Sequence, residues 1–202
     1  MARRTNRSLK RGDQPNTVRI VGGHHGGRRL KYSGDPKVRP MKDRTREAVF
    51  NLLGPFRRTE LAYDLFAGTG AMGLEAISRG AAFATFLERH APTARVIDEN
   101  IATLDVGDQT DVIVTDSFRW ARSNPEPTDA PWVVFCCPPY RLYHERWEDL
   151  SSMLDRFIEQ APSESMIVVE ADQEFDADQL PNIEQWRVRD YAPARIAILS
   201  IE

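Results

Sequence analysis

The sequence contains little cysteine and lacks any long hydrophobic run. Cys136 and Cys137 are its only cysteines, and they are neighbours. Adjacent cysteines make a poor structural disulfide, and two are too few for a zinc site of their own. No apolar run approaches the roughly 20 residues that a membrane-spanning helix needs, and the basic N-terminus lacks the apolar stretch of a secretory signal. We therefore expect a reduced, cytoplasmic protein with neither a metal nor a membrane partner.

The composition is typical of one soluble globular domain. The chain has 202 residues, of which 41% are hydrophobic and 28% are charged. This length suffices for one well-buried core and is too short for two ordinary domains joined by a linker. We find no internal repeat in the sequence.

The net charge of −3 conceals an uneven distribution of charge along the chain. Residues 1–58 contain 16 basic and 4 acidic side chains, whereas residues 59–202 contain 11 basic and 26 acidic ones. Such a division suits a chain that presents its basic segment to a polyanion. A solvated basic tail is the alternative, but the basic residues are spread among Gly and His in a patterned segment, which favours RNA binding.

The basic segment is predicted to divide into a tail and an arm. Residues 1–16 are polar and aperiodic, which is typical of a disordered tail. Residues 17–58 are expected to form an RNA-binding arm, a β-hairpin plus a helix. Its strands are expected at 17–21 and 28–32 around a glycine-rich turn, and its helix at 43–53.

From residue 59 onward, short apolar strands alternate with helices. The expected strands are 61–66, 83–87, 112–115, 132–136, 166–170, 183–190 and 195–201, the last two as an antiparallel pair. The expected helices are 71–79, 92–104, a short one from 117, and 146–160. Repeated strand–helix units predict a Rossmann-like α/β domain over residues 59–202, with a seven-stranded, mostly parallel sheet. Such sheets bind ligands at the carboxyl ends of their strands.

The first of these strands runs into a glycine-rich turn with an acid before it. Gly68, Gly70 and Gly73 allow a tight turn and a close approach to a ligand at a helix N-terminus. Alone, this is the dinucleotide spacing, which would suit an NAD-dependent oxidoreductase. Asp64 instead favours S-adenosylmethionine, because its carboxylate would attract the methionine ammonium and repel a pyrophosphate. The alternative is that Asp64 only caps the glycine turn.

Two further strands also end in acids. Glu88 can accept both ribose hydroxyls of an adenosine, which supports a nucleoside cofactor without choosing among them. Asp116, followed by Ser117, is placed to accept a hydrogen bond from the adenine amine. A cap for the short helix that follows is a nearly equal alternative for Asp116.

The stretch Cys137-Pro138-Pro139-Tyr140 follows an apolar strand and forms a stiff, extended turn that few structural needs would demand. With it, the chain resembles the RsmD family, bacterial small-subunit ribosomal RNA guanine-N2 methyltransferases, from about Val18 to its end. The matching segments are residues 19–23, 28–30, 39–40, 43–51, 64–70, 74–76 and 78–81.

The resemblance implies a class I methyltransferase fold, S-adenosylmethionine as donor, and a guanine of 16S ribosomal RNA in the assembling small subunit as acceptor. The catalytic candidates are Cys137, Pro138, Pro139 and Tyr140. The cofactor-binding candidates are Asp64, Phe66, Ala67, Gly68, Thr69, Gly70, Glu88, Arg89, Asp116 and Ser117. The RNA-binding candidates are Arg19, Arg28, Arg29, Arg39, Lys42 and Arg44.

The chain departs from the family pattern at two places. The family's Asp/Asn-Pro-Pro-Tyr begins here with Cys137, and the Thr-Thr after Arg39-Pro40 is Met41-Lys42. In the family motif, an acidic or amide oxygen and the Pro138 carbonyl would accept the guanine amine hydrogens, while Tyr140 stacks on a flipped-out base. A thiol is a weak acceptor, so the loss is roughly 1.5–3 kcal/mol, or about ten- to a hundred-fold in rate.

Three interpretations of Cys137 follow. The enzyme is slowed, or the chain is a catalytically silent RNA-binding homologue. A nucleophilic Cys137 is disfavoured, because in enzymes that methylate pyrimidine C5 the thiol follows the prolines.

Overall fold

The computed structural model describes residues 17–32, 40–123, 125–126 and 128–202. Its strands are β1 (Thr17–Arg19), β2 (Arg29–Lys31), β3 (Leu61–Asp64), β4 (Phe83–Glu88), β5 (Thr110–Val114), β6 (Trp132–Cys136), β7 (Met166–Asp172), β8 (Trp186–Tyr191) and β9 (Ala194–Ser200). Its α-helices are α1 (Asp43–Leu53), α2 (Ala71–Ser78), α3 (Ala91–Leu104), α4 (Ser117–Ala121), α5 (Arg141–Glu145) and α6 (Trp147–Gln160). The expected disorder of residues 1–16 and the side chain of Arg39 lie outside the described residues.

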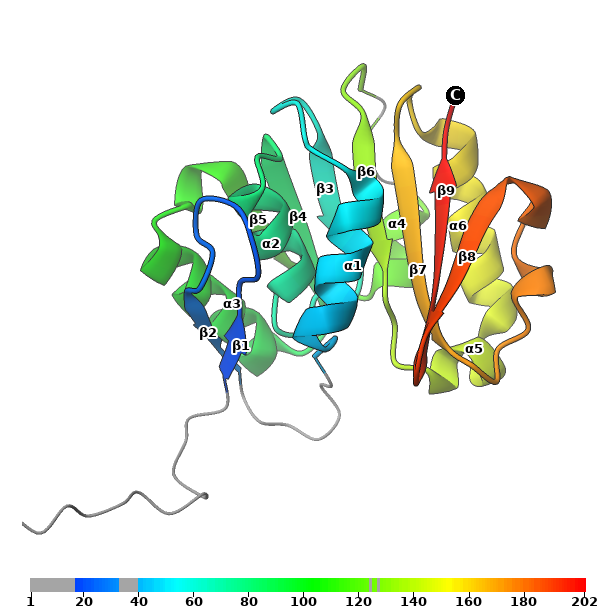
Figure 1. The fold of residues 1–202 in the computed structure, drawn as a ribbon, viewed down its shortest axis with the longest axis horizontal. Helices are drawn as coiled ribbons and strands as arrows, with labels where there is room; N and C mark the ends of the chain where they lie inside the picture. Colours follow the sequence, from blue (N-terminus) through cyan, green and yellow to red (C-terminus); the bar gives the residue numbers. More distant parts are fainter. Residues whose placement is uncertain (1–16, 33–39, 124, 127) are drawn as a thin grey trace, which may run out of the picture.

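Seven strands form one sheet in the order β5-β4-β3-β6-β7-β9-β8 (Figure 1). The first five run parallel to one another, and β9 pairs antiparallel with both β7 and β8. The predicted α/β class, the mostly parallel sheet and its antiparallel end are therefore confirmed. Chain order reverses at β3, which lies between β4 and β6, and ligands bind outside the carboxyl ends of the strands at such a point.

Helices cover both faces of this sheet, as the ribbon shows (Figure 1). One hydrophobic core contains side chains of α1, α2 and α3, and a second core on the opposite face contains those of α4, α5 and α6. Both cores are built from the apolar strands, whose side chains alternate between the two faces. The site at the strand ends therefore rests on a scaffold packed from both sides.

The glycine turn after β3 depends on two of its glycines for different reasons. Gly70 adopts a left-handed backbone conformation with φ of 73°, which side chains rarely tolerate. At Gly73, in the first turn of α2, an added Cβ would lie 2.3 Å from the ring of Phe86 in β4. The third glycine thus serves close helix–strand packing, while the second forms the turn itself.

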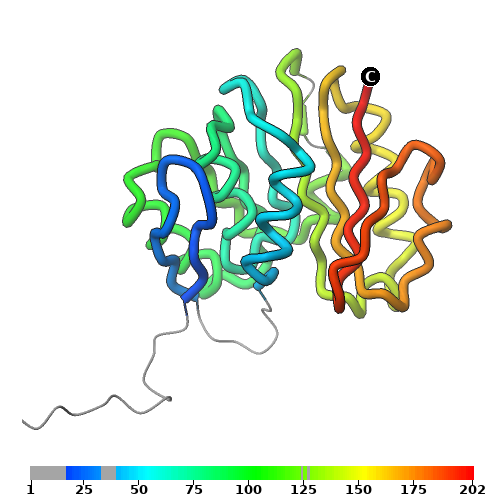
Figure 2. Tube along the Cα trace, in the orientation of Figure 1, coloured from blue at the N-terminus to red at the C-terminus, as the bar shows by residue number. Residues whose placement is uncertain are grey.

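The N-terminal hairpin packs onto the same core as the main sheet. Val18, Ile20 and Leu30 are buried with residues of α2 and α3 in one hydrophobic cluster. The buried Asn100 side chain of α3 accepts from the Lys31 backbone N–H at 2.8 Å and donates to the Lys31 carbonyl at 2.8 Å. Figure 2 shows the hairpin trace, in blue, running alongside the segments of α2 and α3. The predicted hairpin and helix both form, and they are joined to the main domain by packing.

A buried ionic cluster around Glu75 fastens this hairpin to α1 and α2. The Glu75 carboxylate is fully buried and accepts from the backbone N–H groups of Val21 and Gly22, each at 2.7 Å. It also pairs with Arg46 Nε at 3.4 Å and Arg79 Nε at 2.9 Å. Arg46, which is fully buried as well, further donates to the carbonyls of Met41 and Arg19.

Several expected boundaries are wrong, and one helix was missed. Strand β3 ends at Asp64 and not at residue 66, and the hairpin strands are shorter than the expected 17–21 and 28–32. Residues 183–185 form a 3₁₀ turn, and β8 begins only at Trp186, because backbone pairing with β9 starts there. Strand β5 begins at Thr110, two residues before its expected start, because it pairs with β4 from that residue. Helix α5 was not predicted, since its five residues are too few to show a helical period and it lacks the capping acid that precedes the equally short α4.

Among the described residues, no helix is both long and apolar enough to span a membrane.

Replacing Glu75 by Ala should destabilise the protein by about 3–5 kcal/mol, because it leaves the buried Arg46 guanidinium without its buried partner. Urea unfolding followed by circular dichroism measures the difference. Glu99→Ala is the matched control, since the Lys31–Glu99 pair at 3.1 Å is exposed and should contribute only about 0–1 kcal/mol. Equal losses in the two variants would contradict a structural role for the Glu75 cluster.

Candidate active site

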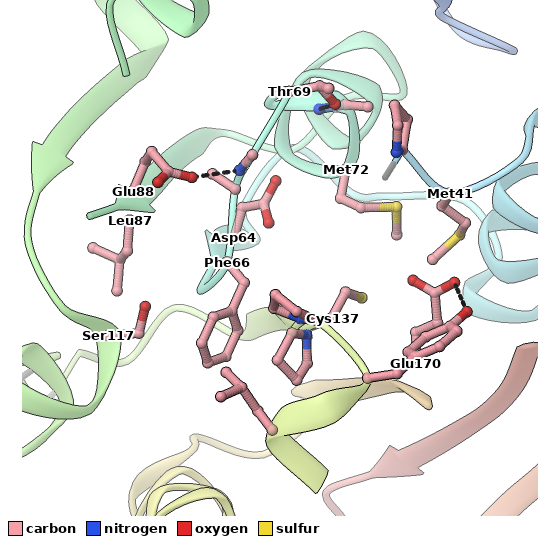
Figure 3. A pocket seen from close by; sticks show the side chains of 18 of the residues that line it. Met41, Asp64, Phe66, Thr69, Met72, Leu87, Glu88, Ser117, Cys137 and Glu170 are labelled. Atoms are coloured by element: carbon pink, nitrogen blue, oxygen red, sulfur yellow. Dashed lines mark hydrogen bonds between the residues drawn. The ribbon is translucent and has the colours of Figure 1, made fainter. Parts of the chain in front are cut away.

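A cavity of about 420 Å³ lies at the carboxyl edge of the sheet, next to the point where chain order reverses. It is lined by residues that follow β3, β4, β5 and β6, together with residues around the start of α1. In Figure 3, Leu87, Glu88 and Ser117 lie on one side, Met41, Cys137 and Glu170 on the other, with Asp64 and Phe66 between them. The cavity therefore has two halves of different composition.

Of the ten predicted cofactor residues, nine line this cavity: Asp64, Phe66, Ala67, Gly68, Thr69, Glu88, Arg89, Asp116 and Ser117. Gly70 is not among the lining residues, and its part is to form the turn that leads into α2. The four predicted catalytic residues, Cys137, Pro138, Pro139 and Tyr140, also line it, as does Lys42.

Asp64 is the most deeply buried acid of the cavity, with only 2% of its surface exposed. Its Oδ2 accepts a hydrogen bond from the Gly73 backbone N–H at 3.1 Å, so it does brace the glycine turn. Burial raises the pKa of Asp64 to about 7, with a further contribution from the negative charge of Glu88. A buried carboxylate of this kind is stabilised by a cationic partner.

Glu88, at the end of β4, is fixed beside the glycine turn. Its Oε2 accepts from the Gly68 backbone N–H at 3.0 Å and its Oε1 from the His90 backbone N–H at 2.8 Å. A carboxylate has about four acceptor positions, so these two bonds are compatible with further donors from a ligand. Two hydroxyls side by side, as in a ribose, match such an oriented carboxylate.

Asp116 caps a helix, as one of the two alternatives predicted, and it also faces the cavity. Its Oδ1 accepts from the Arg119 backbone N–H at 3.0 Å, which caps α4, and the residue also lines the cavity. The next residue, Ser117, is buried and its hydroxyl donates to the Leu65 carbonyl. This bond ties the end of β5 to the end of β3.

These acids fit S-adenosylmethionine better than a dinucleotide. The cofactor carries an ammonium, a ribose diol and an adenine amine, and all three are hydrogen-bond donors that carboxylates can accept. A pyrophosphate would instead bring negative charge to a turn that Asp64 and Glu88 already make acidic. The hydrogen-bond acceptors of this half of the cavity thus match a cationic nucleoside.

The Pro-Pro-Tyr turn forms the other half of the cavity and leads into α5. The Pro139 carbonyl accepts from the Leu142 backbone N–H at 2.9 Å, so the turn is continuous with the helix. The Tyr140 ring is partly exposed, and its hydroxyl donates to Glu170 Oε1 at 3.0 Å. An aromatic ring held at the rim of a cavity is suited to stacking on a planar base.

Cys137 lies partly exposed inside the cavity, directly before the two prolines. Its thiol pKa is raised well above the usual value by burial first, and then by the charges of Glu170 and Asp64. A thiol with a raised pKa is a poor nucleophile, because the thiolate is the reactive form. The local electrostatics therefore argue against covalent catalysis by Cys137.

Glu170 is a cavity residue that the sequence interpretation missed. It lies in β7, contacts Tyr140, and is joined in the lining by Met41, Thr45, Met72 and Pro193. A signal for Glu170 was available, because it closes the apolar run of the fifth strand just as Glu88 closes that of the second. Met72 follows the glycine turn directly, whereas Met41, Thr45 and Pro193 come from segments that approach only through tertiary packing.

The basic candidates on the hairpin and α1 differ in how they are held. Arg28 donates to the Thr103 carbonyl and Arg29 to the Thr17 hydroxyl, each at 3.0 Å, and both stay exposed. Arg19 pairs with Asp43 at 3.2 Å, also at the surface. Lys42 and Arg44 are exposed at the start of α1. Arg44 forms no ion pair with a described residue.

Two of the proteins that are similar in sequence have the same name. Ribosomal RNA small subunit methyltransferase D of Escherichia coli (strain K12) is 38% identical over 124 residues, 61% of this chain and 61% of that protein. The chain thus matches about three fifths of that relative's length. A protein of the same name from Buchnera aphidicola subsp. Acyrthosiphon pisum (strain APS) is 31% identical over 162 residues, 75% of this chain and 82% of that protein.

Solved structures show the same fold. The yhhF protein of Escherichia coli superimposes with a TM-score of 0.73 at 28% identity, covering 92% of this chain and 99% of that one. An RNA methyltransferase from Salinibacter ruber, in complex with S-adenosyl-L-homocysteine, gives a TM-score of 0.60 at 19% identity, covering 81% and 94%. The chain has the class I methyltransferase fold.

A family model described as Conserved hypothetical protein 95 matches residues 18–200. Because this match covers nearly the whole sequence, and because the relatives named methyltransferase D agree with it, the chain belongs to the RsmD family.

Proposed function

We propose that this protein is an S-adenosylmethionine-dependent methyltransferase that acts on guanine N2 of 16S ribosomal RNA in the assembling small subunit. The observation that carries the proposal is the two-part cavity. One half presents three acids that are oriented by backbone hydrogen bonds, and the other presents Pro138 and Tyr140 at the same sheet edge. Relatives named ribosomal RNA small subunit methyltransferase D support an RNA substrate.

The cofactor half acts by binding and orientation. Asp64 would hold the methionine ammonium, with the glycine turn beside it, while Glu88 would hold the ribose and Asp116 the adenine. When bound, S-adenosylmethionine supplies a methyl group on a positively charged sulfur. Phe66 and Leu87 line the cavity among these acids and add apolar surface to it.

The base half positions the acceptor. The guanine amine is planar, because its lone pair is delocalised into the ring, so hydrogen-bond acceptors must orient it for direct transfer. The Pro138 carbonyl would accept one amine hydrogen, and the Tyr140 ring would stack on the flipped-out base. No covalent intermediate is proposed, in keeping with the raised pKa of Cys137.

The second candidate function is a catalytically silent RNA-binding homologue, and Cys137 is the observation that favours it. A thiol in place of the family's Asp or Asn lacks a strong acceptor oxygen. Between full activity and none lies a third possibility, an enzyme that methylates its substrate slowly.

Methyl transfer to undermethylated small ribosomal subunits tests these alternatives. With S-adenosylmethionine, the wild type should produce N2-methylguanosine, detected by mass spectrometry of nucleosides from the 16S RNA. Product only from a Cys137→Asp variant would favour the silent homologue. Calorimetry with S-adenosylmethionine and NAD separates the cofactors, and binding of NAD alone would refute the proposal.

Asp64→Asn should weaken S-adenosylmethionine binding yet stabilise the unliganded protein above neutral pH. The folded-state pKa of about 7 exceeds the ordinary 3.8, so wild-type stability falls as the pH rises between these values. Asn resembles the protonated form and avoids this fall. Each pKa unit corresponds to about 1.4 kcal/mol of stability. The melting temperature of Asp64→Asn should therefore exceed that of the wild type by at least about 2–4 °C at pH 8, and the two should hardly differ at pH 4. If the melting temperatures of the two proteins changed with pH in the same way, Asp64 would not be the buried acid with the raised pKa.

Glu88→Ala should weaken S-adenosylmethionine binding by roughly 1.5–3 kcal/mol, because two ribose hydroxyls lose a charged acceptor. Titration calorimetry measures the change. Glu99→Ala, an exposed acid on α3 that does not line the cavity, is the control. An unchanged affinity in Glu88→Ala would show that the ribose lies elsewhere.

Replacing Arg28, Arg29 and Arg44 with Ala should weaken RNA binding and reduce the slope of log affinity against log salt. Each lost phosphate contact should lower that slope by about one. Cofactor affinity should stay unchanged, since none of the three lines the cavity. The control is a triple variant at the exposed Arg122, Arg187 and Arg189. An unchanged slope in the first variant would mean that the arm does not bind RNA phosphates.

A further inference from the structure

The cavity contains an acid beside Cys137 that its sequence motif does not include. Glu170 lies one step beyond the paired residues Cys136 and Val169 of β6 and β7, and it lines the cavity. After burial, its negative charge is the next largest cause of the raised pKa of the Cys137 thiol. Figure 3 shows the Glu170 carboxylate and the Cys137 side chain on the same side of the cavity.

The Glu170 side chain is oriented by the same tyrosine that is expected to hold the base. The Tyr140 hydroxyl donates to Glu170 Oε1 at 3.0 Å, and the Tyr143 hydroxyl donates to the Glu170 carbonyl at 2.9 Å. Since a carboxylate has about four acceptor positions, a bond from Tyr140 and a bond from a substrate amine are compatible. The carboxylate is thus anchored on both its side chain and its backbone.

We infer that Glu170 is the catalytic acceptor for the guanine amine, in the role that the family motif gives to the residue at position 137. This inference rests on the proposed function. It explains how a chain with a thiol at position 137 retains a strong oxygen acceptor at the base half of the cavity.

The proposed step is balanced in atoms and charge. The amine nitrogen forms a bond to the methyl carbon while the donor's carbon–sulfur bond breaks, and that electron pair stays on sulfur. The proton that the nitrogen loses passes to the Glu170 carboxylate. The positive charge of the donor and the negative charge of the carboxylate disappear together.

Glu170→Gln tests the inference, because it keeps the size of the side chain and removes its ability to take a proton. The single-turnover rate of N2 methylation on undermethylated small subunits should fall about 10- to 100-fold at saturating S-adenosylmethionine. The melting temperature and the affinity for S-adenosylmethionine should not change. Glu174→Gln is the matched control, since Glu174 is exposed and does not line the cavity.

A rescue experiment separates a chemical role from a structural one. Adding Cys137→Asp to Glu170→Gln should restore most of the lost rate, because it returns an acceptor oxygen to the motif position. In the wild-type background, Cys137→Asp should give little gain, since two adjacent carboxylates repel each other. Cys137→Asp should thus raise the rate strongly in the Glu170→Gln background and hardly in the wild type. Such a dependence on the residue at position 170 is not expected if Glu170 only supports the fold.

The outcomes distinguish the inference from the proposed function. An active wild type with an equally fast Glu170→Gln variant overturns the inference alone, as does a slow variant that Cys137→Asp fails to rescue. An inactive wild type that Cys137→Asp activates also overturns it, because Glu170 then does not compensate. If neither protein methylates guanine although both bind S-adenosylmethionine, the proposed function fails as well.

Discussion

The buried Glu75 carboxylate joins the N-terminal segment to the sheet domain, and the shape of the cavity depends on that junction. It binds backbone N–H groups of the hairpin and side chains of α1 and α2 at once. Its partner Arg46 holds the Met41 carbonyl, and Met41 lines the cavity. Such a cluster is stable only while every charge is paired, so the fold of the arm and the wall of the site are coupled.

The acidic side chains of the site lie at one edge of the sheet because the parallel strands have their carboxyl ends there. Asp64, Glu88 and Glu170 come from strands that are adjacent or nearly so in the sheet order, although they are far apart in sequence. Each acid is fixed by hydrogen bonds: Asp64 and Glu88 to backbone amides of the glycine turn and its neighbourhood, Glu170 to Tyr140. Carboxylates fixed in this way are suited to a cationic ligand, because their orientation is set before the ligand arrives.

The fold, and the residues around the glycine turn that line the cavity, could be predicted from the sequence because their signals are local. A strand followed by a glycine turn places Asp64 and Gly70 without knowledge of anything distant. The Glu75 cluster could not be predicted, since it joins Glu75 to backbone groups more than 50 residues away. The pairing of Glu170 with Tyr140 likewise needs the register of β6 and β7, which no local pattern contains.

The hairpin has a consequence for how a target nucleotide is selected. The hairpin shares a core with α2 and α3, and its backbone is hydrogen-bonded to the side chains of Asn100 and Glu75. The backbone positions of its exposed arginines are therefore fixed relative to the cavity. A nucleic acid gripped by those arginines would offer the cavity a nucleotide at a set offset from the gripped phosphates. Under the proposed function, the target nucleotide would then be selected by its distance from the bound phosphates as well as by the identity of its base.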